Sequence, residues 1–149
     1  MKTSIVEYLK KYYGLQEAGE KDIKDLEEIS SEEDFKKDEI IFKENEPGDK
    51  MYLVIKGMVK IYLTELDGGK TIALVKPGEI FGEIAFFDKQ PHSAEAMALM
   101  DTEIFVLDLN KFNDIRKTNP GLALNITDVV LKTFAKRLRG TTRKMYGLY

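Results

Sequence analysis

Hydrophobic residues recur at helical intervals at the start of the chain. The spacing of Ile5 and Tyr8 predicts a helix over residues 4–13 with Gly14 as its stop, and a second short helix is predicted over residues 20–29. Each predicted helix has a single apolar face, which is typical of a helix that packs on a larger core. We therefore expect both helices to serve packing.

From Phe35 onward the hydrophobic period changes to that of strands. Short apolar runs follow one another at close intervals over residues 40–42, 51–55, 58–63, 71–75, 94–99 and 102–107. Turn residues separate the runs, including Asp67-Gly68-Gly69 and Pro47-Gly48-Asp49, which has the residue order of a type II turn. About eight short strands at this spacing predict a mainly β fold, an eight-stranded antiparallel β-roll of the jelly-roll-like kind.

Helical spacing returns after residue 109. A short helix is predicted over residues 110–118, and Asn119-Pro120 then provides a cap and a first-turn proline for a long C-terminal helix. Gly140 is expected to end or bend this helix. The helix carries two apolar stripes. The first is Leu122, Ile126, Val129 and Val130, and the second, at seven-residue spacing, is Leu124, Leu131, Leu138 and Met145, with Phe134 between them.

One stripe is enough to pack the long helix on a roll, so the second stripe is expected to cover a ligand, a domain or a partner chain. We favour a homodimer formed through Leu124, Leu131, Phe134 and Leu138. The open alternative is that this stripe covers the roll of its own chain.

Length and composition narrow the class of protein. The 149 residues, 43% of them hydrophobic and 33% charged, suit one folded domain. We expect N-terminal helices over 1–30, the β-roll over 31–108 and C-terminal helices over 109–149. The chain has no cysteine and one histidine, so neither a disulfide framework nor a transition-metal site is expected. No apolar stretch is long enough to cross a membrane and no signal peptide is visible, which favours the cytoplasm.

Charge is unevenly distributed along the chain. The net charge is −3, so there is no overall attraction to nucleic acid, but after Asp128 every charged residue is basic. The basic residues are Lys132, Lys136, Arg137, Arg139, Arg143 and Lys144. We interpret them as the solvated end of a helix, where cations suit the helix dipole, and contact with an anionic surface is the alternative.

The stretch over residues 81–94 is the strongest candidate for a site. Gly82 stands directly before Glu83 and a short apolar run, and Pro91 leads into a polar pair. A glycine that lets backbone approach a ligand, followed by a helical turn with free N–H groups, is suited to hold an anion. We interpret this stretch as a phosphate-binding turn.

The order of elements and four short motifs resemble the cyclic nucleotide-binding domain of the catabolite activator and protein kinase A regulatory families. The motifs, in chain order, are the run from Phe35 to Phe42, Glu46-Pro47-Gly48-Asp49, Gly57 in its hairpin, and Lys76-Pro77-Gly78-Glu79 leading into Phe81-Gly82-Glu83. The resemblance covers roughly residues 20–140. It implies a stand-alone regulatory module that binds a cyclic nucleotide, such as cyclic AMP or cyclic GMP, or a related anionic small molecule, and that signals through its C-terminal helix.

The resemblance also implies roles for particular residues. Glu83 would accept a hydrogen bond from the ribose 2′-hydroxyl, and Gly82 would line the sugar-phosphate together with the N–H groups of Ile84 and Ala85. Ser93 would donate to a phosphate oxygen. The implied ligand-binding set is Gly82, Glu83, Ile84, Ala85, His92 and Ser93.

One residue departs from the family pattern. His92 stands directly after Pro91, where the family has its phosphate-clamping arginine. Histidine is mostly neutral at pH 7 and lacks the planar fork that matches two phosphate oxygens. The loss of one charge-assisted bond is worth about 1.5–3 kcal/mol, or roughly 10- to 150-fold in affinity. Lys89, in the same loop, is a candidate to replace part of the lost charge.

The alternatives to a nucleotide sensor are open at this stage. A degenerate cassette would serve as a protein-interaction or dimerisation module with an unidentified downstream protein, and His92 motivates that reading. An enzyme of the cupin type is not expected, because those metal sites draw on several histidines. Direct DNA binding is not expected either, because only nine residues follow Gly140 and a helix-turn-helix domain needs many more.

Overall fold

Two four-stranded antiparallel sheets form the body of the protein, with helices at both ends of the chain. The computed structural model describes residues 4–13, 18–64 and 70–147, so the turn expected at Asp67-Gly68-Gly69 and the stop expected at Gly14 lie outside the described residues. In chain order the elements are α1 (Ile5–Tyr13), α2 (Glu20–Ile29), β1 (Ser30–Phe35), β2 (Ile40–Phe42), β3 (Lys50–Lys56), β4 (Val59–Leu63), β5 (Lys70–Val75), β6 (Ile80–Phe81), α3 (Glu83–Asp88), β7 (Glu95–Ala98), β8 (Thr102–Asp108), α4 (Leu109–Thr118) and α5 (Pro120–Met145).

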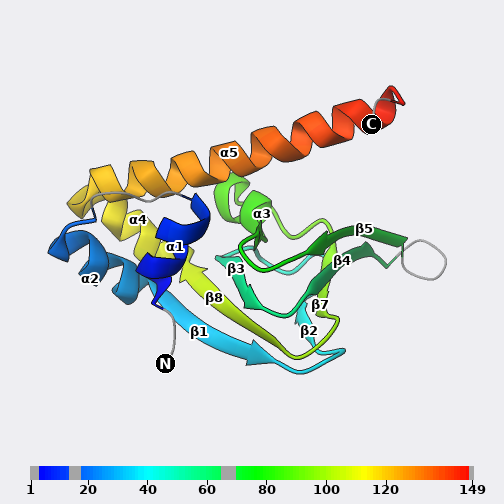
Figure 1. Ribbon diagram of the computed structural model, residues 1–149, viewed down its shortest axis with the longest axis horizontal. Helices are drawn as coiled ribbons and strands as arrows, with labels where there is room; N and C mark the ends of the chain where they lie inside the picture. Colours follow the sequence, from blue (N-terminus) through cyan, green and yellow to red (C-terminus); the bar gives the residue numbers. More distant parts are fainter. Residues whose placement is uncertain (1–3, 14–17, 65–69, 148–149) are drawn as a thin grey trace.

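The strand order confirms the predicted β-roll. One sheet has the order β1-β8-β3-β6 and the other β2-β7-β4-β5, and all strand pairs are antiparallel. In Figure 1 the roll carries α1, α2 and α4 at one end, and α5 runs past α3 beyond that helical cluster. The fold is the eight-stranded antiparallel roll that the turn spacing predicted.

Two groups of buried apolar side chains hold this arrangement together. Phe42, Val54, Phe81 and Ile104 belong to the group between the sheets. The second group joins the helices to the roll and comprises, among others, Ile5, Tyr8, Leu26, Phe86, Phe112, Leu122 and Ile126. Burial of this apolar surface is the main stabilising contribution to such a fold. Side chains of α1 and α2 belong to the second group, which is consistent with the packing role predicted for both helices.

The first strand is longer than its sequence pattern predicted. Only Phe35 was expected in a strand, but β1 begins at Ser30 and pairs with β8 from Ser30 opposite Leu107 to Phe35 opposite Thr102. The segment Ser-Ser-Glu-Glu-Asp-Phe has no apolar alternation, because it lies at the edge of its sheet with mostly exposed or half-buried side chains. Pairing with β8 therefore decides its conformation.

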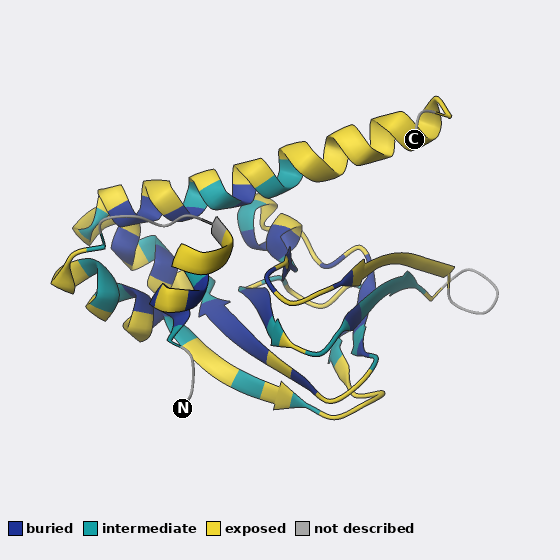
Figure 2. Cartoon of the chain, in the orientation of Figure 1, coloured by how far each residue is buried: buried dark blue, intermediate teal, exposed yellow. Residues whose placement is uncertain are grey.

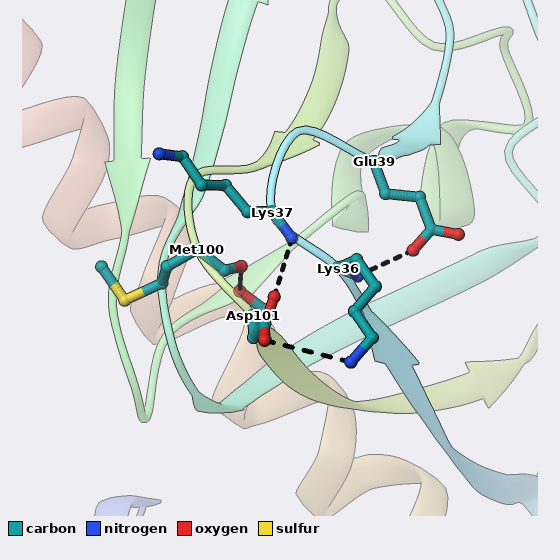
Figure 3. Close-up of polar contacts among 6 residues, drawn as sticks. Lys36, Lys37, Glu39, Met100 and Asp101 are labelled. Atoms are coloured by element: carbon teal, nitrogen blue, oxygen red, sulfur yellow. Dashed lines mark hydrogen bonds and ion pairs between the residues drawn. The ribbon is translucent and has the colours of Figure 1, made fainter.

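The turn between β1 and β2 is fastened to the turn between β7 and β8, as Figure 3 shows. The backbone N–H of Lys37 donates to Asp101 Oδ1 at 3.0 Å, and that of Lys36 donates to Glu39 Oε2 at 2.8 Å. The ammonium group of Lys36 lies 4.0 Å from Asp101 Oδ2, but both side chains are exposed and such a pair contributes little. The hydrogen bond from Lys37 N–H to Asp101 is therefore the more effective tie between the two turns, whereas that from Lys36 N–H lies within the first turn.

Gly48 has a different role from the one predicted. A type II turn would need a positive φ at this glycine, and the described glycines with positive φ are Gly57, Gly78, Gly82 and Gly147. Gly48 instead lies against α3, where an added Cβ would come within 2.0 Å of Ala85 Cβ. The turn prediction was wrong, and close approach of two backbones is the reason for glycine here.

The long C-terminal helix begins where the sequence predicted. Asn119 accepts a hydrogen bond from the N–H of Leu122 at 3.3 Å, and Pro120 occupies the first turn. Gly140 does not end the helix, which continues to Met145, so the expectation of a helix end at this glycine was wrong. A glycine inside α5 lowers the stability of the helix but keeps its backbone N–H and C=O groups for the helical hydrogen bonds. A long helix therefore continues through such a residue.

The two apolar stripes of α5 have opposite environments. Leu122, Ile126 and Val130 are buried against the rest of the protein. Leu124, Leu131, Leu138 and Met145 are all more than half exposed. Figure 2 shows the C-terminal part of α5 exposed along its length. The second stripe does not cover the roll of its own chain within the described residues.

No helix in the described part of the chain combines the length and apolarity needed to cross a membrane. In those same residues no three or more His, Asp or Glu side chains come together in a way that would hold a metal ion.

Candidate functional site

A cavity of about 360 Å³ opens between α3, the β4–β5 hairpin and α5. It is lined by Phe42, Ile61, Ile72, Ala73, Val75, Phe81, Gly82, Glu83, Ile84, Ala85, Pro91, His92, Ser93, Ala94, Arg137 and Thr141. All six residues that the sequence singled out as ligand-binding are in this lining. The structure thus brings the candidate residues to one place, and their binding of a ligand stays a prediction.

Gly82 sets the start of α3. Its φ is 74°, in the left-handed region, and an added Cβ would lie 2.7 Å from Tyr52 Cδ2. Glycine meets both demands without strain. No side chain among the described residues caps the first turn of α3, which begins at Glu83. The N–H groups at the start of a helix have no partner within it, so those of Ile84 and Ala85 are available to an acceptor at the cavity.

Glu83 is a buried acid, with only 2% of its surface exposed. Its compensating charge comes from α5, because Nη1 of Arg137 forms an ion pair with Oε1 of Glu83. This oxygen accepts no hydrogen bond of regular geometry within the described residues. Arg137 also donates from Nη2 to the carbonyl oxygen of Ile80. The arginine side chain is 41% exposed, so the pair joins a buried carboxylate to a partly solvated cation.

His92 lines the cavity but is held by its own packing. Its ring stacks on that of Phe42 with centroids 3.7 Å apart, and only 6% of the residue is exposed. Two backbone hydrogen bonds fix the loop, from His92 N–H to Glu46 O at 2.9 Å and from Asn45 N–H to His92 O at 2.8 Å. Burial lowers the pKa of His92 below 6.5, although Glu46 and Asp49 act in the opposite direction. The ring is therefore neutral at pH 7.

Lys89 does not face this cavity. It is the C-cap of α3, with φ 60° and its N–H donating to Ala85 O at 3.1 Å, and it lines a separate crevice beside Pro47 and Asp49. The suggestion that Lys89 replaces the missing cassette charge is therefore wrong for this arrangement. Phe86, by contrast, is fully buried in the core.

Arg137 and Thr141 are the cavity residues that come from α5, and neither was predicted to belong to the site. They are four residues apart, so they lie on the same face of α5. The basic residues at the end of the chain were predicted to be the solvated end of a helix. Their spacing alone does not indicate which arginine would pair with Glu83. Only the path of α5 past α3 brings these residues to the cavity (Figure 1).

Comparison with known proteins finds a match to the family model of the cyclic nucleotide-binding domain over residues 32–119. A relative described as the CRP-like cAMP-activated global transcriptional regulator of Mycobacterium tuberculosis is 29% identical over 116 residues, 77% of this chain and 50% of its own length. The Cyclic AMP receptor protein of Thermus thermophilus is 36% identical over 100 residues, 66% of this chain and 44% of its own. The chain spans about half the length of these relatives.

Solved structures agree with this match. A cyclic nucleotide-binding domain from Methylobacillus flagellatus superposes with a TM-score of 0.84 at 23% identity, covering 97% of this chain and 82% of its own. The catabolite activator protein of Thermus thermophilus superposes with a TM-score of 0.69 at 28% identity, covering 90% and 60%. The first likeness supports the fold alone, since its identity is low.

Proposed function

The chain belongs to the cyclic nucleotide-binding domain family, and on this premise we propose that it is a non-catalytic regulatory module that senses a cyclic nucleotide or a related anionic small molecule. The observation that carries the proposal is that Gly82, Glu83 and Ser93 line one cavity with an arginine of α5. Ligand would bind against α3, and α5 would pass on the response.

Three features of the cavity support this function. Its volume of about 360 Å³ falls within the range of small-molecule sites. Its walls are mainly apolar, and the polar groups of Glu83, Ser93 and Arg137 are also in the lining, which suits a ligand with a flat base, hydroxyls and one anionic group. The uncapped start of α3 adds backbone donors for that anionic group.

Titration calorimetry with cyclic AMP and cyclic GMP tests the proposal directly, with linear 5′-AMP as the comparison ligand. We expect saturable binding of at least one cyclic nucleotide. Affinity weaker than micromolar would agree with the absence of the cassette arginine. Absence of heat at millimolar concentration of both cyclic nucleotides would exclude the nucleotide version of the proposal.

A second candidate function is an interaction module whose cassette binds no cyclic nucleotide. The neutral, stacked ring of His92 favours it, since no cation stands at the position after Pro91. The variant His92→Arg separates the two functions. If the wild-type protein shows no binding of cyclic AMP and the variant binds it tightly, the cassette is degenerate. Micromolar binding by the wild-type protein would exclude this second function.

The exposed stripe on α5 suits a homodimer as the means of transmitting a response. Leu131 and Leu138 are 56% and 68% exposed, and their seven-residue spacing matches the contact positions of a coiled coil. Phe134, which is half-buried, adjoins Ile84 and Phe87 of α3. A dimer along this stripe would place the interface next to the helix that lines the ligand cavity.

A further inference from the structure

Among the described residues, the lining of the cavity has one formal cation, and that cation is not in the cassette. Among the residues that line it, Glu83 is the acid and Arg137 the base, while His92 is stacked and neutral at pH 7. Lys89 lines another crevice. An anionic ligand in this cavity therefore has a single fixed positive charge within its walls, and that charge comes from α5.

The guanidinium group of Arg137 can contact more than one acceptor. It is a planar fork of five N–H bonds, and it contacts Glu83 and the carbonyl oxygen of Ile80 through different nitrogens. The side chain is 41% exposed, so it is not sealed by its neighbours. An arginine that is already oriented by two acceptors loses little conformational freedom when it takes a third.

Glu83 alone would oppose an anion. The residue is 2% exposed, and a buried charge is screened poorly by solvent. The ion pair with Arg137 removes this repulsion. Arg137 can therefore favour an anionic ligand in two separable ways, by neutralising Glu83 and by contacting the anion itself.

The same face of α5 is basic beyond the cavity. Arg137 and Thr141 also line an adjoining groove of about 620 Å³ between α5 and β5, together with Lys136 and Lys144 from α5. Glu79 is the acid in that lining. Cations clustered along one wall raise the local concentration of an anion. The groove thus favours approach of an anion toward Arg137.

We infer that Arg137 is the residue that binds the anionic group of the ligand, in place of the arginine that the cassette lacks at His92. This inference rests on the proposed function of the cavity and adds the identity of its cation. The anion-binding half of the site would then be shared between the start of α3 and the middle of α5. Occupancy by a phosphate would tie the two helices together through Arg137.

A double-mutant cycle on Glu83 and Arg137 tests the direct contact. Binding of cyclic AMP is measured by calorimetry for the wild type, Arg137→Gln, Glu83→Gln and the double variant, with Lys132→Gln, an exposed residue of the same helix outside both linings, as the matched control. We expect Arg137→Gln to weaken binding by about 10- to 150-fold in both backgrounds, as for loss of a charge-assisted bond. Lys132→Gln should change affinity less than about threefold, as for a distant point charge.

Two results would overturn the inference. If Arg137→Gln has no effect in the Glu83→Gln background, the arginine only neutralises the acid. If it has no effect in the wild-type background, it does not serve the ligand at all. Thermal unfolding of each variant shows whether it is folded before binding is compared, and Arg137→Lys, which keeps the charge, should recover part of the affinity.

A titration with inorganic phosphate separates failure of the inference from failure of the proposed function. In the wild-type protein we expect saturable NMR shifts of the Arg137 side-chain Nε–H resonance, with Arg139 on the exposed face of α5 as the internal control. If cyclic AMP and cyclic GMP do not bind but phosphate shifts Arg137 selectively, the function is wrong and the anion site stands. If phosphate shifts Arg137 no more than Arg139, the anion site is wrong.

Discussion

The imidazole ring of His92 lies flat against the phenyl ring of Phe42, with centroids 3.7 Å apart and planes inclined by 10°. The stack joins the cassette loop to β2 and removes the ring from water. A residue at the position of the family's phosphate-binding arginine has here become part of the packing of the roll.

This packing predicts an acid-sensitive fold. Burial lowers the folded-state pKa of His92 below the 6.5 of an exposed histidine, so the unfolded chain takes up the proton first. Well above pH 6.5 the histidine is neutral in both the folded and the unfolded state, so its titration does not change the free energy of unfolding there. As pH falls through 6.5, the free energy of unfolding should decrease, and this loss should level off below the folded-state pKa.

NMR titration measures the pKa directly, because His92 is the only histidine in the chain. We expect a midpoint below 6.5. Urea unfolding of the wild type and His92→Gln, compared between pH 7.5 and 5.5, isolates the contribution of this residue from that of the carboxylates. A midpoint at or above 6.5 would contradict the prediction.

Gly48 and Gly140 predict opposite effects of the same substitution. Gly48→Ala would bring a Cβ within 2.0 Å of Ala85 Cβ and 3.0 Å of the Ala85 backbone, so we expect a loss of about 1–3 kcal/mol of stability. An added Cβ at Gly140 has no atom within 4 Å, so Gly140→Ala should stabilise α5 by about 0.5–1 kcal/mol. Urea denaturation measures both, and a shift of the two variants in one direction would refute the assignment.

The position of Glu83 predicts that the protein binds cyclic AMP more tightly than an analogue that lacks the ribose 2′-hydroxyl. If its carboxylate accepts a hydrogen bond from the 2′-hydroxyl, 2′-deoxy cyclic AMP should bind the wild type about 10- to 150-fold more weakly than cyclic AMP. Glu83→Gln should narrow this gap, because a neutral amide oxygen forms a weaker bond. Calorimetry with both ligands gives the ratio for each protein. Equal affinities in the wild type would remove Glu83 from the sugar site.

The exposed stripe on α5 predicts an oligomer that specific substitutions dissociate. Leu131→Ser with Leu138→Ser should raise the dissociation constant of a dimer by more than about tenfold, since two leucines of each chain lose their burial. Lys132→Ser with Arg139→Ser, one residue further along the same helix, is the matched control. Sedimentation equilibrium distinguishes them. A monomeric wild type, or equal effects of the two variants, would count against this interface.

Much of the fold follows from local pattern. The strand runs, the short helices and the cap formed by Asn119 and Pro120 were all predictable, because each depends on neighbours a few residues away. The cassette from Gly82 to Ser93 was predictable for the same reason. Its residues come from one continuous stretch, so the cavity wall that they form needs only one turn of helix and one loop.

The amino-acid sequence by itself determined most of the elements, their order and the continuous stretch from Gly82 to Ser93. The tertiary structure decided what those elements meet. It made Ser30–Phe35 a strand through pairing with β8, brought Gly48 against Ala85, stacked His92 on Phe42, and carried Arg137 to Glu83. Each of these contacts joins residues that are distant along the chain, and a periodic pattern contains no information about the path of one element past another.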